Sequence, residues 1–213
     1  MLKRRLPPNR NLTGISYYVD NHVIDSKKAK LLRKFHLHGW IYLQVSDTVL
    51  TEILSAQSKL KKWKLVRSIS IFPISMGPTV LGSSIQGFSL IGSEVDKSRI
   101  EKIHVLLWPN HTFDSDNAIM RENSKARTRV RDTLIVSNTI RYSISYLVTE
   151  DKEILKAQSR IRSEFSSFYA IDINAATLES IKAVARARTH SKESLPRWPS
   201  IKVLEKNSAL LGI

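Results

Sequence analysis

Two periodicities alternate along the 213-residue chain. Short runs rich in β-branched and aromatic residues predict strands over residues 15–19, 41–44, 145–149 and 168–173. Between and after these runs, apolar residues recur at helical spacing and predict helices over residues 26–37, 46–63, 130–141, 152–161 and 175–188. Strands that alternate with helices favour an α/β fold, in which helices flank a parallel sheet on both faces.

This regular pattern is interrupted over residues 66–115, which are rich in glycine and proline. Short apolar runs at 68–72, 88–91 and 103–107 have the composition of strands. We therefore expect an insertion after the second helix, carrying a hairpin or a small subdomain.

The two ends of the chain differ from its middle. Residues 1–14 are basic, and no apolar segment follows them as it would in a signal peptide, so we expect a basic arm. Residues 189–213 contain Pro196 and Pro199 and are expected to be a loosely docked extension. One domain, residues 15–188, should hold the core, which suits a chain of this length.

The chain is strongly basic, with 34 Lys and Arg against 19 Asp and Glu and a formal net charge of +15. Such an excess on a compact chain suits a polyanionic partner, and nucleic acid is the first candidate. An anionic membrane is the other candidate, but no apolar run approaches the ~20 residues of a spanning helix, so we expect no membrane partner. The absence of cysteine excludes a disulfide framework and a thiolate nucleophile and fits a cytoplasmic protein.

Four acidic residues occupy related positions in the predicted fold. Asp20 directly follows the first strand, and Asp151 comes two residues after the strand at 145–149. Glu52 lies early in the helix after the second strand, and Asp132 lies in the first turn of the helix predicted at 130–141. Functional groups of parallel sheets gather at the carboxyl ends of the strands, so we expect these four side chains to converge there.

Converging carboxylates have a chemical meaning. They repel one another and raise one another's pKa, and a hard divalent cation with oxygen ligands relieves that repulsion. A cation held in this way, beside basic residues that bind phosphate, suits phosphodiester hydrolysis. Each acidic residue alone has an ordinary explanation, as a turn residue, an exposed helix residue or a helix cap. The hypothesis therefore depends on all four converging.

The segments around these residues resemble the motifs of PIN-domain ribonucleases. Tyr17-Tyr18-Val19-Asp20-Asn21 resembles the first motif of that family, an apolar strand that ends in Asp. Residues 46–53 resemble the second motif, and residues 131–136 resemble the third. Residues 146–154 resemble the fourth and most specific motif, an apolar strand followed by Thr-x-Asp-x-Glu. The resemblance covers residues 15–65 and 125–175 in the family's order.

The resemblance implies a PIN-like, Rossmann-like parallel sheet and an endoribonuclease that cleaves single-stranded or looped RNA with Mg²⁺ or Mn²⁺. It implies Asp20, Glu52, Asp132 and Asp151 as the catalytic metal cluster, with Glu153 as an auxiliary carboxylate. Many members are toxins of toxin–antitoxin pairs, commonly dimeric and silenced by an antitoxin. The implied partners are therefore an RNA substrate, an antitoxin protein and a second copy of the chain.

Two basic sets are candidates for binding RNA phosphates, to which such residues contribute affinity without sequence information. The first set consists of Lys59, Lys61, Lys62, Lys64 and Arg67, and Trp63 within it is a candidate for base stacking or for a core position. The second set leads directly into Asp132 and consists of Lys125, Arg127, Arg129 and Arg131. A solvated surface is the ordinary alternative for both sets.

Three other functions compete with this hypothesis. A non-catalytic RNA-binding or scaffold protein of a ribonucleoprotein would be equally basic. A DNA-directed nuclease on the same fold is the second alternative, although we see no helical arch. A metal-free ribonuclease would need two converging histidines, whereas His36 and His38 straddle a predicted helix end and are expected at the surface.

Overall fold

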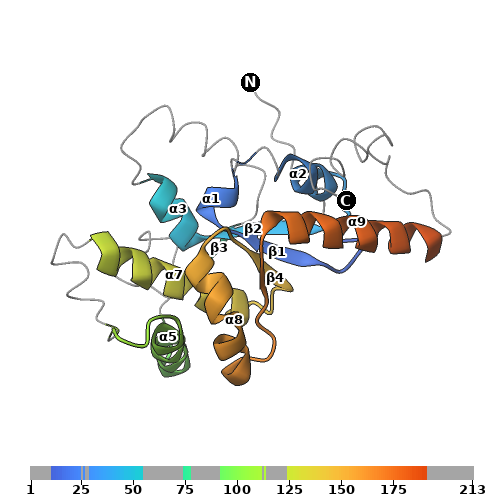
Figure 1. Ribbon diagram of the computed structural model, residues 1–213. Helices are drawn as coiled ribbons and strands as arrows, with labels where there is room; N and C mark the ends of the chain where they lie inside the picture. The colour runs from blue at the N-terminus through green and yellow to red at the C-terminus, as the bar shows by residue number, and fades with distance from the viewer. Residues whose placement is uncertain are drawn as a thin grey trace.

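The computed structural model describes residues 11–24, 26, 29–54, 74–77, 92–111, 113 and 124–190. Within these ranges, five parallel strands form one sheet in the order β3-β2-β1-β4-β5 (Figure 1). The strands are β1 Ser16–Val19, β2 Tyr42–Ser46, β3 Ile74–Ser75, β4 Tyr146–Val148 and β5 Ala170–Ile171. The predicted α/β class with a parallel sheet is therefore confirmed, and the arrangement is consistent with a Rossmann-like fold.

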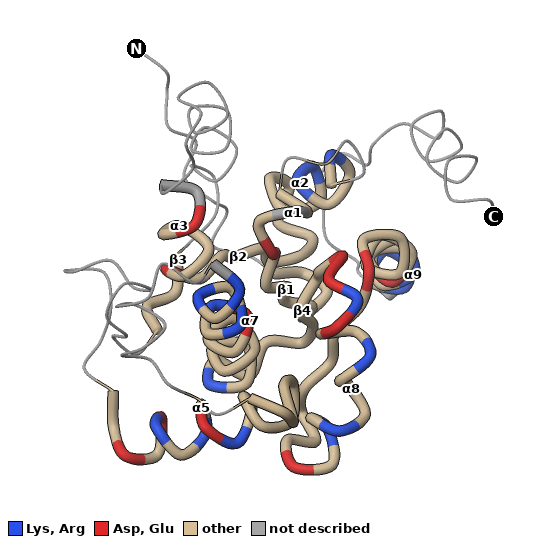
Figure 2. Tube along the Cα trace, turned by 60° about the vertical axis from the view of Figure 1, so that its left-hand side comes forward, with Lys and Arg blue, Asp and Glu red and all other residues tan. Residues whose placement is uncertain are grey.

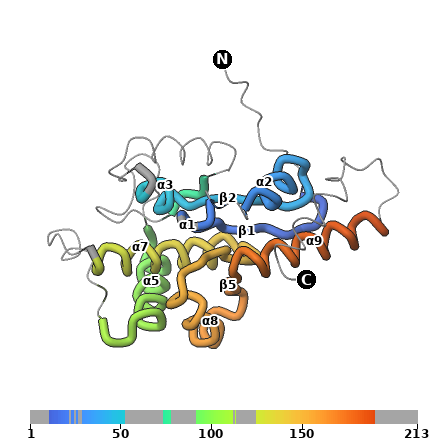
Figure 3. The backbone as a smooth tube through the Cα atoms, turned by 45° about the horizontal axis from the view of Figure 1, so that its top comes forward, coloured from blue at the N-terminus to red at the C-terminus, as the bar shows by residue number. Residues whose placement is uncertain are grey.

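Helices cover both faces of this sheet. Their bounds are α1 Asn21–Ile24, α2 Ala29–Leu37, α3 Asp47–Leu54, α5 Glu94–Leu107, α7 Ser124–Arg141, α8 Lys152–Glu164 and α9 Ile173–His190. α2 and α9 pack together on one face, while α7 and α8 lie on the other with α5 packed against both (Figures 1 and 3). None of the helices within the described ranges is long and apolar enough to cross a bilayer.

The centre of the core is β1, because it pairs with both β2 and β4. Successive side chains of a strand point to opposite faces, so Tyr17 and Tyr18 fill the two sides of the sheet, and both are fully buried. The Tyr17 hydroxyl hydrogen-bonds the Ser180 hydroxyl of α9 at 2.9 Å. This contact ties the central strand to the helical layer above it.

The pairing register aligns the ends of the two central strands. Val19 of β1 is paired with Val148 of β4, and the Asp20 N–H donates to the Val148 carbonyl at 3.0 Å. The residues that follow β1 and β4 therefore meet at one edge of the sheet. This edge holds the candidate site described below.

The predicted strand at 103–107 is wrong, because these residues form the last turns of α5. Ser93 and Asp96 form a reciprocal capping box that begins the helix. Ile100, Ile103 and Leu107 are buried at helical spacing, which a short apolar run conceals. α5 packs on α7 and α8, and β3 pairs with β2, so these parts of the predicted insertion belong to the main fold.

The helix predicted at 130–141 begins earlier than expected, at Ser124. Its first two turns carry good helix formers, including Lys125 and Ala126, and Val130 packs with Ile100 of α5. Asp132 therefore lies in the middle of α7 and not in its first turn, which corrects the sequence-based expectation. Two helical turns that contain basic residues therefore come before Asp132 within α7.

His36 also departs from the expectation. It is fully buried, and its Nδ1 accepts a hydrogen bond from the Leu43 N–H at 3.1 Å, so it joins α2 to β2. His38 is exposed, as expected. The predicted strands at 68–72 and 88–91, the end of the helix predicted at 46–63, and residues 1–10 and 191–213 lie outside the described residues.

Candidate active site

Asp20 follows the central strand and is held in place by hydrogen bonds. Its Oδ1 accepts from the Asn21 N–H at 2.6 Å, and its Oδ2 accepts from the Thr149 hydroxyl at 2.7 Å. The side chain is buried, with 6% of the residue exposed. Both carboxylate oxygens are therefore oriented by groups at the same edge of the sheet.

Thr149 connects the ends of β1 and β4. It is fully buried, and its hydroxyl also accepts a hydrogen bond from the Asp151 N–H at 3.0 Å. One hydroxyl thus contacts the Asp20 side chain and the Asp151 backbone together. The Thr-x-Asp pattern seen in the sequence is, in three dimensions, a link between two of the predicted site residues.

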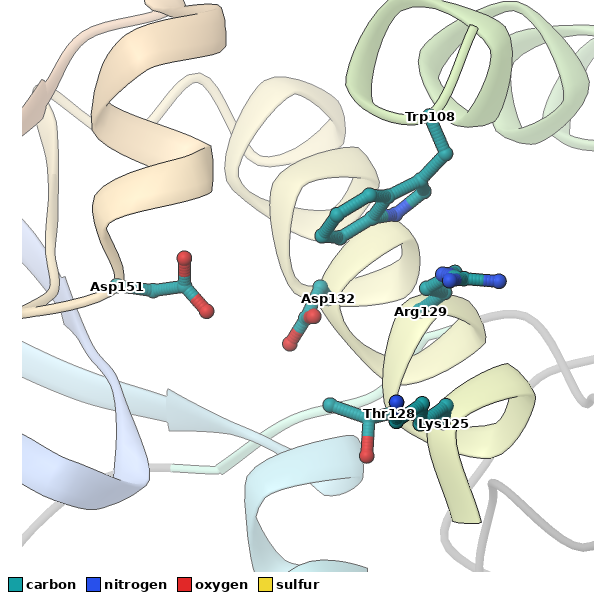
Figure 4. Close-up of a pocket in the computed structure, with 6 residues that line it drawn as sticks. All are labelled: Trp108, Lys125, Thr128, Arg129, Asp132 and Asp151. Carbon is teal, nitrogen blue, oxygen red and sulfur yellow. The ribbon is translucent and has the colours of Figure 1, made fainter. Parts of the chain in front are cut away.

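Asp151 is the N-cap of α8. Its Oδ1 accepts hydrogen bonds from the Glu153 and Ile154 N–H groups at 2.7 and 3.3 Å. Capping explains its presence at this position without any catalytic role. The cap leaves its Oδ2 without a hydrogen bond to the helix, and the carboxylate points toward that of Asp132 across a pocket (Figure 4).

Asp132 is the most deeply buried carboxylate of the set after Asp20, with 8% of the residue exposed. Burial raises the pKa of Asp132 well above its usual range, and nearby negative charges raise it further. These charges belong to Asp151, Asp20 and Glu52. The structure therefore places the other three predicted carboxylates close enough to Asp132 for their charges to raise its pKa. We call these four residues the carboxylate cluster.

Glu52 approaches the cluster from α3, which Ser46 caps by accepting the Val49 N–H at 3.2 Å. The Glu52 carboxylate lies 3.8 Å from the Arg131 guanidinium, and both side chains are mostly buried. Burial lowers the pKa of Arg131, while the charge of Glu52 opposes that change. Arg131 is thus an ion-pair partner of Glu52, and its charge also acts on Asp132.

Glu153 is placed differently from the cluster. It is exposed on α8, and its carboxylate forms an ion pair with Lys156 at 2.9 Å. Among the described residues, no three His, Asp or Glu side chains are arranged closely enough to hold one metal ion. The four carboxylates therefore share an electrostatic field without forming a compact coordination shell, although their oxygen donors are of the type that Mg²⁺ and Mn²⁺ prefer.

A pocket of about 250 Å³ opens beside the cluster (Figure 4). We call it the Trp108 pocket, and its lining residues are Trp108, Lys125, Thr128, Arg129, Asp132 and Asp151. Positively charged positions follow α7 close to acidic positions at the strand ends (Figure 2). Asp151 thus faces the α7 side of the pocket, where Asp132 lies on the same helix as Lys125 and Arg129.

The basic residues expected to bind RNA lie in different surroundings. Arg129 lines the Trp108 pocket, whereas Arg131 is paired with Glu52 and Arg127 is partly buried. The other predicted set, Lys59, Lys61, Lys62, Lys64 and Arg67 with Trp63, lies outside the described residues.

Sequence analysis missed Trp108 as a lining residue. Trp108 ends α5, and its backbone N–H donates to the His104 carbonyl at 2.7 Å. The segment before it was expected to be a strand, so no pattern connected it with α7. Lys125, which belongs to the predicted basic set before Asp132, lines the pocket together with Arg129.

Comparison of the chain with protein families, with curated proteins and with solved structures finds no match.

Proposed function

We propose that the protein is a divalent-metal-dependent endoribonuclease that hydrolyses single-stranded or looped RNA at the carboxylate cluster. The observation that carries the proposal is the position of Asp132. This carboxylate is buried, and the negative charges of three other carboxylates raise its pKa. Asp132 and Asp151 line a pocket that Lys125 and Arg129 also line. A site that only bound phosphate would not favour four acidic groups beside it, because they repel the ligand.

The residues that would hold the cation are Asp20, Asp132, Asp151 and Glu52. Such a cation, when bound, lowers the pKa of a water molecule and offsets the charge that develops on the phosphate. These side chains suit Mg²⁺ or Mn²⁺ by the type of their ligand atoms, because four carboxylates offer only hard oxygen ligands. Glu153 is proposed as an auxiliary carboxylate on the basis of its place in the fourth motif.

The protein's own groups have separate tasks in this proposal. Thr149 and the Asn21 N–H fix the two oxygens of Asp20, so that this carboxylate keeps one orientation. Lys125 and Arg129 supply positive charge for the RNA phosphates at the rim. Asp132 lines the same pocket as Lys125 and Arg129, so the RNA phosphate would lie beside the carboxylate cluster.

The test compares the wild type with Asp20→Asn and Asp151→Asn on a labelled single-stranded RNA with Mg²⁺, Mn²⁺ or EDTA. Asn caps helices about as well as Asp, so Asp151→Asn removes the charge while α8 keeps its cap. Asp172→Asn is the matched control, because Asp172 also follows a strand and caps α9, accepting from the Asn174 N–H at 2.7 Å. Its charge does not contribute to the raised pKa of Asp132.

We expect cleavage by the wild type and by Asp172→Asn in Mg²⁺ or Mn²⁺, and loss of cleavage in EDTA and in the two cluster variants. Activity that survives EDTA, or equal activity in all four proteins, would overturn the metal-nuclease proposal. A parallel reaction with single-stranded DNA tests the DNA-directed alternative, which predicts cleavage of DNA in preference to RNA.

A non-catalytic RNA-binding protein is the second candidate, and one observation favours it. Glu52 is paired with Arg131, and within the described ranges no three acidic or histidine side chains form a compact metal site. RNA binding without cleavage under every metal condition would support this candidate. Action as a toxin with an antitoxin partner, and assembly as a homodimer, remain predictions from the sequence resemblance.

A further inference from the structure

The side of the Trp108 pocket across from Asp151 contains groups unrelated to metal binding. Lys125, Thr128 and Arg129 come from neighbouring turns of α7, at the three- and four-residue spacing that places side chains on one face of a helix. Trp108 comes from the end of α5, 17 positions before Lys125. Two helices therefore build a basic and aromatic wall directly beside Asp132.

Trp108 is held firmly but only partly buried. Its backbone is fixed at the end of α5, and its indole packs against the edge of the core while lining the pocket. The Arg129 guanidinium lies 5.7 Å from the centre of the indole ring, within the range of a cation–π contact. A rigid aromatic surface with a cation beside it is the usual platform for an unpaired nucleic-acid base.

The indole N–H of Trp108 supports a role beyond packing. This nitrogen is buried and has no hydrogen-bond acceptor among the residues that the structure describes. An unpaired buried donor costs about 1–3 kcal/mol, a cost that Phe or Leu would avoid at the same position. The indole of Trp108 thus adds a flat ring of large area to the lining of the pocket.

The size and charge of the pocket define its ligand. A volume of about 250 Å³ is below the roughly 300–1,000 Å³ of pockets for drug-sized molecules, and it suits one nucleotide. Lys125 is exposed and Arg129 is half-buried, so both can reach a phosphate while keeping contact with water. The neighbouring carboxylates disfavour a second phosphate deeper in the site.

We propose that the Trp108 pocket binds the nucleotide next to the scissile phosphate, with its base stacked on Trp108 and its phosphate bound by Lys125 and Arg129. This inference rests on the proposed function, because it identifies the substrate as RNA with an unpaired base beside the cleaved bond. A base inside a duplex is stacked on its neighbours and is unable to use this surface. The pocket thus accounts for a preference for single-stranded or looped RNA.

The test measures binding in EDTA, where the proposed cleavage does not occur. Fluorescence anisotropy gives the Kd of a labelled RNA octamer and of an octamer of the same backbone without bases. Trp108→Leu should weaken binding of the RNA by roughly 5- to 150-fold, the equivalent of one lost base stack, and leave the abasic octamer unchanged. Trp108→Phe should lose less, and Lys125→Ala should weaken both ligands alike.

Tyr169→Leu is the matched control. Tyr169 is a partly exposed aromatic residue with Arg162 at 4.0 Å from its ring, but it is not part of the Trp108 pocket. Its substitution should leave both Kd values unchanged. Photo-crosslinking of an RNA containing 5-iodouridine to the wild type, with the modified peptide mapped by mass spectrometry, should identify Trp108 without any substitution.

Several outcomes would overturn the inference. They are equal binding of the RNA by the wild type and Trp108→Leu, equal weakening of the two ligands, or a crosslink only at another residue. If cleavage depends on metal and on Asp20 while Trp108→Leu binds normally, the subsite is wrong and the nuclease stands. If Trp108 crosslinks and discriminates the two octamers but no metal supports cleavage, the subsite stands and the nuclease is wrong.

Discussion

Thr149 offers a direct test of how the candidate site is built. Its hydroxyl donates to the Asp20 carboxylate at 2.7 Å and accepts from the Asp151 N–H at 3.0 Å, in a fully buried position. Thr149→Val replaces the hydroxyl with a methyl group of similar size. The substitution therefore removes two hydrogen bonds while changing the packing very little.

The expected cost follows from these two contacts. A hydrogen bond to a charged group contributes about 1.5–3 kcal/mol, and one between neutral groups about 0.5–1.5 kcal/mol. Together they predict a loss of about 2–4 kcal/mol in the free energy of unfolding. For a chain of this size each kcal/mol corresponds to about 2–4 °C, so Tm should fall by roughly 5–15 °C.

The measurement is thermal and urea unfolding of the wild type, Thr149→Val and Thr149→Ser, together with RNA cleavage at a temperature where all three are folded. Thr149→Ser keeps the hydroxyl and loses one methyl group, at a cost of about 1 kcal/mol. Cleavage should fall far more in Thr149→Val than in Thr149→Ser, because only the former releases Asp20. Equal stability and activity of the Ser and Val variants would refute the role of the hydroxyl.

Two further substitutions test the electrostatics and the packing. The pKa of Asp132 is raised, so the ionised carboxylate opposes folding, and the wild type should lose stability as the pH rises from the unfolded value of about 4 through the folded pKa. Asp132→Asn should therefore raise Tm at neutral pH in EDTA, with a gain that disappears near about pH 4, and a pH-independent gain would contradict this cause. A Cβ at Gly77 would lie 2.5 Å from Asn138 Nδ2, so Gly77→Ala should cost about 1–3 kcal/mol in urea unfolding. Asn138→Ala should recover part of that loss in a double-mutant cycle, and an unchanged cost in that background would show that the contact is not the cause.

The positions of Asp20 and Asp151 could be predicted because each follows an apolar strand. Strand composition is local, and parallel pairing brings the strand ends to one edge whatever the details of the packing. The rule covers only these two residues, because Glu52 and Asp132 lie on helices; the charges of Asp20, Asp151 and Glu52 all raise the pKa of Asp132. The compact metal shell implied by the family resemblance does not follow from strand ends, because side-chain separation depends on packing.

Asp132 shows where the prediction became less accurate. α7 begins at Ser124 and packs on α5, where Val130 contacts Ile100, so residues far apart in the chain meet at this helix. Sequence patterns alone placed the helix start at residue 130 and Asp132 in the first turn. The corrected position leaves two basic turns ahead of Asp132, and those turns form the wall of the Trp108 pocket.

The sequence by itself determined the alternation of strands and helices, the basic character of the chain and the four candidate carboxylates, because these depend on local periodicity and composition. Only the tertiary structure decided which neighbours each carboxylate has. It paired Glu52 with Arg131, buried His36, separated Glu153 from the cluster and set Trp108 opposite Asp151. Such contacts depend on the packing of helices that are distant in the chain, and no short sequence pattern encodes that packing.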